Sequence, residues 1–252
     1  MSPINDVKRR PNRSLSSAAD GKRYDATYFA DELHRDHWFR NNAAKRRRRW
    51  NEVLRMLEPG RDDRVLEIGS AAGAHTLRLA PLVRDVIGID RAIEGAALAK
   101  RNATRQGVAN AAFAVCDAAS LAFAGGIFSK VAAIDFVEHV DDDILARVFS
   151  EVHRVLTATG RLAIYTPCAT HYVERLKSRN LILKQIAGHV AVRPPEAYAR
   201  LLAQAGFDVS EQWFLPSDYP AFGLIDRIMM HVPGVRRLFR FRICIVAMKT
   251  PS

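Results

Sequence analysis

One short run of residues, 65–73, combines an acidic side chain with two glycines at a spacing that suits ligand binding. It reads Val-Leu-Glu-Ile-Gly-Ser-Ala-Ala-Gly, so a buried strand ends in a tight turn that contains Gly69 and Gly73. Residues from Ala74 onward are typical of a helix, which places the turn at a helix N-terminus. Asp90 ends the next apolar run, where a carboxylate can accept hydrogen bonds from ribose hydroxyls. This spacing predicts a nucleotide-binding unit.

Three histidines are candidates for proton transfer. His139 follows the predicted strand 129–135, His171 follows the predicted strand 160–166, and His189 lies in a later loop. Histidine titrates near neutral pH and is the natural general base. Each of the three is a candidate catalytic residue, and for each the alternative is a purely structural histidine.

Alternating strands and helices position these residues. The sequence predicts strands at 64–68, 85–89, 111–115, 129–135, 160–166, 207–214 and 240–248. It predicts helices at 42–58, 74–83, 92–106, 142–156 and 195–204. This alternation indicates a parallel sheet with right-handed crossovers, in which ligands bind at the carboxyl ends of the strands.

The helix predicted at 42–58 contains the most conspicuous charge run of the chain. Trp50, Val53, Leu54 and Leu57 fall on one face of it. The run Lys-Arg-Arg-Arg-Arg at 45–49 is interpreted as the solvated face of the same helix. The alternative interpretation is phosphate contact with nucleic acid or anionic lipid.

Composition sets the limits on the class of protein. The chain has 252 residues, 48% of them hydrophobic, which is enough for a substantial core, and no apolar stretch long enough for a transmembrane span. The first twenty residues lack the apolar segment of a secretory signal, and the three cysteines are scattered without metal-ligand spacing. These features predict a cytoplasmic protein with reduced thiols. A net charge of +11 favours anionic partners without choosing among them.

The chain divides into a basic N-terminal arm and one domain. We expect residues 1–23 to be disordered and 24–252 to form the single domain. Within it we expect an N-terminal helical cap at 24–58 and a cofactor-binding core at 59–167. Residues 168–252 are expected to supply substrate-side loops, a lid and the last strands. The sequence does not indicate an oligomeric state.

Further motifs follow the glycine-rich turn in a fixed order. They are Glu67–Gly73, Gly88–Asp90, Cys116–Ala118, Asp135–Val140, Glu151–Leu156 with Thr159–Leu162, Gly188–Val190 and Ala205–Phe207. Together they resemble the class I S-adenosylmethionine-dependent methyltransferases over roughly residues 45–215 and the last strand. The final motifs resemble the small-molecule branch, which includes the ubiquinone and menaquinone biosynthetic methyltransferases.

The resemblance implies a fold, a cofactor and a set of site residues. The implied fold is α/β, a Rossmann-like seven-stranded, mostly parallel sheet with helices on both faces and an antiparallel final strand. The implied cofactor is S-adenosyl-L-methionine, with S-adenosyl-L-homocysteine as product. The residues implied to bind it are Glu67, Gly69, Ser70, Ala71, Gly73, Asp90, Arg91, Asp117, Ala118 and Asp135. Ala71 departs from the family, which has a glycine there.

The acceptor implied by this branch is a small molecule or a lipid-like compound, methylated on oxygen, carbon or nitrogen. The aromatic segment 24–40 either packs on the sheet or closes the acceptor pocket. Residues 224–241 mix apolar and basic side chains and are interpreted as part of a lid over the site. The alternative is an interfacial helix that makes peripheral membrane contact. The substrate-binding candidates are Tyr24, Tyr28, His34, His37, Trp38 and Glu138.

Two other functions remain as alternatives. A nucleic-acid methyltransferase is suggested by the net charge, but Asp135-Phe136-Val137-Glu138 stands where the best-known amino-methylating types carry an amide and a proline. We therefore do not expect nucleic acid as the partner. An NAD(P)-dependent oxidoreductase would use Gly69, Ala71 and Ala74 as a degenerate dinucleotide fingerprint. No metal site is expected.

Overall fold

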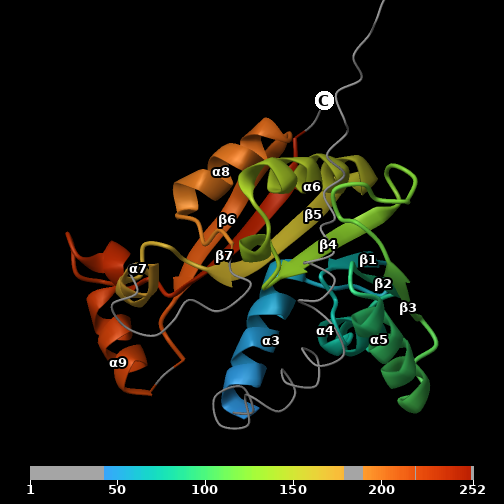
Figure 1. Cartoon of the computed structure of the whole chain (residues 1–252), viewed down its shortest axis with the longest axis horizontal. Coiled ribbons are helices and arrows are strands. Elements are labelled where there is room, and N and C mark those ends of the chain that lie inside the picture. The colour runs from blue at the N-terminus through green and yellow to red at the C-terminus, as the bar shows by residue number, and fades with distance from the viewer. Residues whose placement is uncertain (1–42, 179–189, 219, 251–252) are drawn as a thin grey trace, which may run out of the picture.

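The computed structural model describes residues 43–178, 190–218 and 220–250. These residues form a seven-stranded sheet in the order β3-β2-β1-β4-β5-β7-β6 (Figure 1). β7 is antiparallel to both of its neighbours, whereas the strands from β3 to β5 are parallel. The Rossmann-like α/β fold with an antiparallel final strand is confirmed.

The elements follow one another in the predicted alternation. The strands are β1 Arg64–Ile68, β2 Asp85–Asp90, β3 Ala111–Val115, β4 Phe128–Ile134, β5 Leu156–Pro167, β6 Phe207–Leu215 and β7 Arg242–Lys249. The α-helices are α3 Ala43–Leu57, α4 Ala74–Leu79, α5 Ile93–Arg105, α6 Asp142–Val155, α7 Tyr172–Ser178, α8 Pro195–Gln204 and α9 Pro220–Met229. Short 3₁₀ turns are η1 Ala80–Leu82, η2 Val137–His139 and η3 Arg236–Phe239. No helix of the described part is long and apolar enough to cross a bilayer.

Helices cover both faces of the sheet and bury two apolar layers. Figure 1 shows α3, α4 and α5 on one face, α6 and α8 on the other, and α7 with α9 together at one end. Side chains alternate along each strand, so Val65 packs in the layer under α3, while Leu66 and Ile68 pack under α6 and α8. This alternation fixes which side chains at the strand ends face each helical layer.

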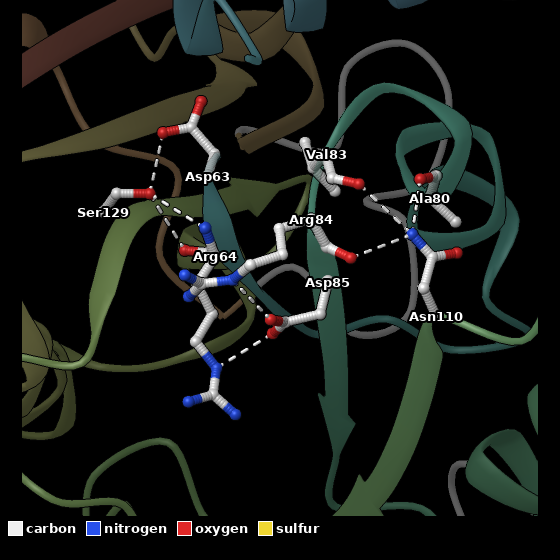
Figure 2. Close-up of polar contacts among 8 residues, drawn as sticks. All are labelled: Asp63, Arg64, Ala80, Val83, Arg84, Asp85, Asn110 and Ser129. Carbon is white, nitrogen blue, oxygen red and sulfur yellow. Dashed lines mark hydrogen bonds and ion pairs between the residues drawn. The ribbon is translucent and has the colours of Figure 1, made fainter. Parts of the chain in front are cut away.

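Polar contacts tie the amino ends of the strands together (Figure 2). The Ser129 hydroxyl donates to Asp63 at 2.8 Å and accepts from the backbone N–H of Arg64, which begins β1, at 3.0 Å. Arg64 also pairs with Asp85 at the start of β2, at 2.8 Å. The Asn110 side-chain amide donates to the backbone carbonyls of Ala80, Val83 and Arg84, which lie in η1 and just after it. These contacts hold the amino ends of β1, β2 and β4 and the chain before β3 together.

Several boundaries differ from the prediction, and each has a physical cause. The predicted helix 74–83 changes to a 3₁₀ turn at residue 80, because Pro81 has no N–H to donate. β5 begins at Leu156 instead of 160, because Leu156 already pairs with Phe128. On α3 the fully buried face is formed by Val53, Met56 and Leu57, with Leu54 only half-buried. The predicted connection between the last two strands contains the helix α9.

Some predictions lie outside the described residues. The N-terminal arm 1–23, the aromatic segment 24–40 and His189 all belong to the parts of the chain that the structure does not describe, so the predictions made for them stay predictions. The division into cap, core and lid remains a prediction.

Candidate active site at the carboxyl edge of the sheet

The reversal of strand order places β1 and β4 side by side at the centre of the sheet. The chain proceeds from β1 toward β3 on one side and from β4 toward β5 on the other. In such sheets ligands bind at the carboxyl ends on either side of this switch point. Gly69 follows β1 and Phe136 follows β4, and a Cβ built on Gly69 would lie 2.9 Å from the Phe136 ring. The two loops are therefore in close contact, and a side chain at Gly69 would not fit.

The glycine-rich loop takes an unusual backbone conformation at three positions. Gly69 has a φ of 74° and Gly73 a φ of 80°. A Cβ on Gly73 would also lie 2.8 Å from Phe113. Ala71, which stands where the family has glycine, has a φ of 45°. An L-residue in this left-handed region costs roughly 1–2 kcal/mol, so the loop carries strain at this point.

Asp90 lies at the end of β2 and holds the loop. Its carboxylate accepts the backbone N–H of Ala71 at 2.9 Å and that of Ala92 at 2.8 Å. Burial raises its pKa, and these N–H groups and the charge of His139 oppose the rise. A carboxylate has about four lone-pair sites, so Asp90 retains capacity for a ribose hydroxyl.

Glu67 is buried within β1, under the first turn of α4. It accepts a hydrogen bond from the Thr76 hydroxyl. Burial raises the pKa of Glu67 to about 7, against the effect of Thr76. The carboxyl therefore lies directly behind the glycine-rich loop and titrates near neutral pH.

Asp117 and Ala118 follow β3 at the same edge. The Asp117 carboxylate accepts the backbone N–H of Ala119 at 2.9 Å, which forms an Asx turn. Asp117 is exposed, whereas Ala118 is buried in the core. The turn and a ligand contact are compatible, since one oxygen of Asp117 is enough for the turn.

Asp135 joins two arginines at the end of β4. It forms an ion pair with Arg242 of β7 and another, at 3.0 Å, with Arg49 of α3. Burial alone would raise the pKa of Asp135, but Arg242 and Arg49 outweigh it and hold that pKa well below its usual range. Its φ of 51° is a second strained backbone position at this edge.

Glu138 is the most deeply buried carboxyl group of the edge. One oxygen accepts the Thr166 hydroxyl at 3.0 Å, and the other has no hydrogen-bond partner within the described chain. Burial, followed by the charge of Asp135, raises the pKa of Glu138 to about 8. Glu138 is therefore mostly protonated at neutral pH and can act as a hydrogen-bond donor.

The two described histidines of the prediction have different surroundings. His139 lies in η2, near Asp90, at the centre of the edge. His171 is fully buried, and its Nε2 lies 3.1 Å from Asp226 of α9, while its Nδ1 accepts the N–H of Val173. Burial lowers the pKa of His171, against the effect of Asp226. Its hydrogen bonds connect α7 to α9.

The structure brings further residues to the site that the motifs did not indicate. They are Lys45, Arg49, His75, Tyr165, Thr166, Tyr198 and Arg242. Contrary to the interpretation of 45–49 as a solvated face, Lys45, Arg48 and Arg49 are half-buried in ion pairs. The sequence contained a signal for this burial. Lys45 and Arg49 stand at helical spacing before Val53 and Met56, so they share the face of α3 that is buried. Nothing in the sequence indicated Arg242.

The residues present fit a nucleoside-type cofactor. The loop between Gly69 and Gly73 is closed by contacts that leave no room for side chains at the two glycines. The buried Ser70 hydroxyl in this loop has no partner among the described residues, and a buried polar group usually has one. Asp90 is the predicted acceptor for the ribose hydroxyls, and Glu67 is a second carboxyl group at the end of the neighbouring strand. The arrangement thus offers polar groups for the whole length of a nucleoside ligand.

Comparisons with known proteins point to one family. Residues 65–160 match a family model described as a methyltransferase domain. A 23S rRNA (uracil(1939)-C(5))-methyltransferase of Stenotrophomonas maltophilia is 45% identical over 65 residues, which are 26% of this chain. The chain spans 15% of the length of that relative. The uncharacterized methyltransferase YcgJ of Bacillus subtilis is 26% identical over 181 residues, 68% of each chain.

Solved structures share the fold. The crystal structure of YcgJ has a TM-score of 0.62 at 20% identity and covers 82% of this chain and 100% of its own. Magnesium protoporphyrin IX methyltransferase from Synechocystis, solved with bound S-adenosylhomocysteine, has a TM-score of 0.66 at 16% identity. That match covers 92% of this chain and 99% of the other.

Proposed function

Because residues 65–160 match a methyltransferase domain and the fold is that of known methyltransferases, we propose that this chain is a class I S-adenosylmethionine-dependent methyltransferase. We propose that it transfers a methyl group from that cofactor to a small-molecule acceptor. The observation that carries the proposal is the glycine-rich loop, which is held by Asp90 at the switch point of the sheet. The match to a methyltransferase family also favours this function over an oxidoreductase. The motifs at 188–190 and 205–207 support the ubiquinone and menaquinone branch as the finer assignment.

In this proposal the chain's own residues bind the cofactor, orient the acceptor and exclude water from the site. When bound, the cofactor supplies an electrophilic sulfonium methyl group. Asp90 would hold the ribose, Asp117 the adenine and Glu67 the amino acid part. Positioning an acceptor against such a group lowers the activation barrier by on the order of 7–11 kcal/mol, which is the main contribution to the rate. The proposed function therefore requires a formed pocket more than a catalytic triad.

For an acceptor that must lose a proton, His139 is the base we propose. It lies at the carboxyl edge near Asp90, whereas His171 is held in its pair with Asp226. A positioned base adds about 10²–10⁴-fold to the rate. Glu138, with its free oxygen, is proposed to contact the acceptor.

A second acceptor class, RNA, is favoured by one observation. The relatives that match first are rRNA methyltransferases, and the net charge of +11 suits a polyanion. The match covers 26% of this chain and 15% of the relative, however, and the basic residues on the inner face of α3 are paired with carboxylates. The small-molecule acceptor is therefore the first proposal.

We further propose that α9 and the residues after it bring the site to an anionic lipid surface. The buried face of α9 carries Gly223 and Asp226, while Leu224 and Ile228 are 62% and 60% exposed. Residues 220–240 contain four arginines and one carboxylate, Asp226, which is buried. An outward apolar face flanked by cations is the pattern of an interfacial helix. Such a surface would give access to a lipid-like acceptor.

Calorimetric titration of S-adenosylhomocysteine tests the main proposal. We expect micromolar binding to the wild type and at least tenfold weaker binding to Asp90→Asn, which loses charge at the ribose position. Asp85→Asn is the matched control, because it makes the same change at the opposite end of β2. Binding of NAD with no binding of S-adenosylhomocysteine would overturn the proposal.

A further inference from the structure

Four cations converge on the carboxyl edge beside the glycine-rich loop. Lys45 and Arg48 of α3 pair with Asp218 at 3.8 and 3.3 Å. Arg49 of α3 and Arg242 of β7 pair with Asp135. Lys45, Arg48, Arg49 and Arg242 are called the cationic cluster below.

These cations form one electrostatic unit. The charge of Lys45 interacts with Asp218, Arg49, Arg242 and Asp135, and burial lowers its pKa. The guanidinium groups of Arg49 and Arg242 both lie against the Tyr165 ring, at 5.6 and 5.2 Å from its centroid. The unit therefore spans α3, β5 and β7, although its members are far apart in sequence.

The cationic cluster holds more positive than negative charge. It has four cations against the two carboxylates Asp135 and Asp218, and the neighbouring carboxyl group of Glu138 is mostly protonated. Holding uncompensated like charges in a partly buried place is unfavourable. An anion in this position would balance the excess.

Two buried polar atoms at the cationic cluster have no hydrogen-bond partner among the described residues. The Nε of Arg242 is buried and has no hydrogen-bond partner in the described part of the chain, and the same holds for Nδ1 of His75. The charges of Arg49 and Asp135 act on His75, which places its ring next to the cluster. The Nε–H of Arg242 is a donor, and Nδ1 of His75 donates or accepts according to its tautomer. A buried polar group without a partner costs about 1–3 kcal/mol, so both atoms mark positions where a ligand atom can bind.

The cationic cluster lies beside the glycine-rich loop, where the methyl acceptor must bind. Asp135 directly precedes Phe136, whose ring contacts the backbone of Gly69 in the cofactor loop. A group bound by the cationic cluster would thus lie beside the cofactor, where the methyl acceptor must be placed.

We propose that the cationic cluster binds an oxyanion, a carboxylate or a phosphate, that belongs to the methyl acceptor. The proposal rests on the methyltransferase function proposed above and narrows its substrate class to anionic small molecules. Arginine suits this role because its planar fork pairs with two oxygens at once. Arg242 supplies the Nε–H that has no partner among the described residues, and Lys45 supplies an ammonium group.

Calorimetry on the full chain saturated with S-adenosylhomocysteine tests the proposal. The probes are inorganic phosphate, benzoate and benzamide, the last being a neutral analogue of benzoate, all at one ionic strength. We expect phosphate or benzoate to bind and benzamide not to bind. Whichever anion binds more tightly identifies the phosphate or the carboxylate as the group that is recognised.

Matched variants on one helix localise the effect. Lys45→Gln should weaken the anion at least tenfold, while Arg47→Gln, the same charge change on the exposed face of α3, should weaken it less than twofold. Arg48→Gln, the second cation on Asp218, repeats the test with a different side chain. Each variant is first titrated with S-adenosylhomocysteine, and unchanged affinity there shows that its cofactor site is intact.

Three outcomes would overturn the proposal: no anion binding, equal binding of benzamide, or equal losses in Lys45→Gln and Arg47→Gln. The last would indicate a general effect of net charge. If S-adenosylhomocysteine fails to bind the wild type, the proposed function fails, and the same anion titrations without it still decide whether the cluster is an anion site.

Discussion

Ala71 is the residue at which this chain departs most informatively from the methyltransferases that it resembles. It keeps the left-handed backbone that a glycine would adopt at no cost, with a φ of 45°. Its N–H is bonded to Asp90, so the fold maintains the conformation despite the methyl group. The strain is therefore stored at the centre of the proposed cofactor site, as often happens where a ligand is held.

Replacing Ala71 by glycine should relieve this strain. The left-handed conformation costs alanine roughly 1–2 kcal/mol, and the glycine loses about 0.4–1 kcal/mol through the greater entropy of the unfolded chain. We therefore expect urea unfolding to show a gain in the free energy of unfolding of about 0–1.6 kcal/mol. Calorimetry should show tighter binding of S-adenosylhomocysteine, because the site gains space. Weaker binding would mean that the methyl group itself contacts the cofactor.

Glu138 should make stability depend on pH. Burial and the charge of Asp135 raise its pKa in the folded protein to about 8, above the unfolded value near 4.5. The protonated form therefore stabilises the fold below about pH 4.5, and this contribution is lost as the pH rises to about 8. The variant Glu138→Gln has no carboxyl group to titrate at this position. Between pH 5 and 8, the free energy of unfolding should therefore fall by on the order of 3 kcal/mol less in the variant than in the wild type.

Urea unfolding at a series of pH values checks this expectation. Glu67→Gln is a useful comparison, because the pKa of Glu67 is raised only to about 7 and its effect should end at lower pH. Parallel curves for wild type and Glu138→Gln would show that Glu138 is ionised in the folded protein.

At the scale of elements, one buried hydrogen bond connects the helices at the end of the sheet. Asp226 of α9 receives both His171 Nε2 and the backbone N–H of Ser217, at 3.1 and 2.8 Å. His171 is also surrounded by the rings of Tyr172 and Phe241. The face of α9 that carries Asp226 is therefore bonded to the start of α7, and the apolar face of α9 is exposed to solvent.

Asp226→Ala should loosen this end of the molecule. Two buried donors lose their acceptor, which costs about 1–3 kcal/mol for a buried group left unsatisfied. Hydrogen exchange should show faster exchange in α7 and α9 with the sheet unchanged. Arg227→Ala, on the exposed side of the same helix, serves as the control and should leave exchange as in the wild type. An unaltered exchange pattern in Asp226→Ala would contradict the role of this bond.

The sequence predicted the elements that have strong local signals. β1 and β3 have the predicted bounds, because apolar runs and glycines delimit them. A helix in 224–241 was only the alternative interpretation, because the outward face of α9 is apolar, opposite to the pattern of a helix on a core. The motifs named Glu67 and Asp90 as cofactor-binding candidates, and that role stays a prediction. Arg242 follows no motif and reaches the carboxyl edge only because β7 pairs with β5.

At the scale of the whole molecule, the outward face of α9 concentrates exposed apolar side chains at one end of the protein. The double variant Leu224→Gln with Ile228→Gln should bind vesicles rich in phosphatidylglycerol several-fold more weakly than the wild type in co-sedimentation. Ile93→Gln, at an exposed isoleucine of α5, controls for the loss of apolar surface elsewhere. Phosphatidylcholine vesicles should bind less of the wild type, since they lack the anionic charge. Negligible binding of all proteins would refute lipid contact.

The order of the sheet also governs how the chain must assemble during synthesis. β7 follows β6 in the chain yet lies between β5 and β6. As a ribosome releases the chain, β6 emerges first and has no neighbour, while the edge of β5 stays unpaired. Both wait for residues 242–249, and open strand edges are sites of aggregation. A nascent chain that lacks β7 therefore exposes two unpaired strand edges, and both are sites at which another chain can pair.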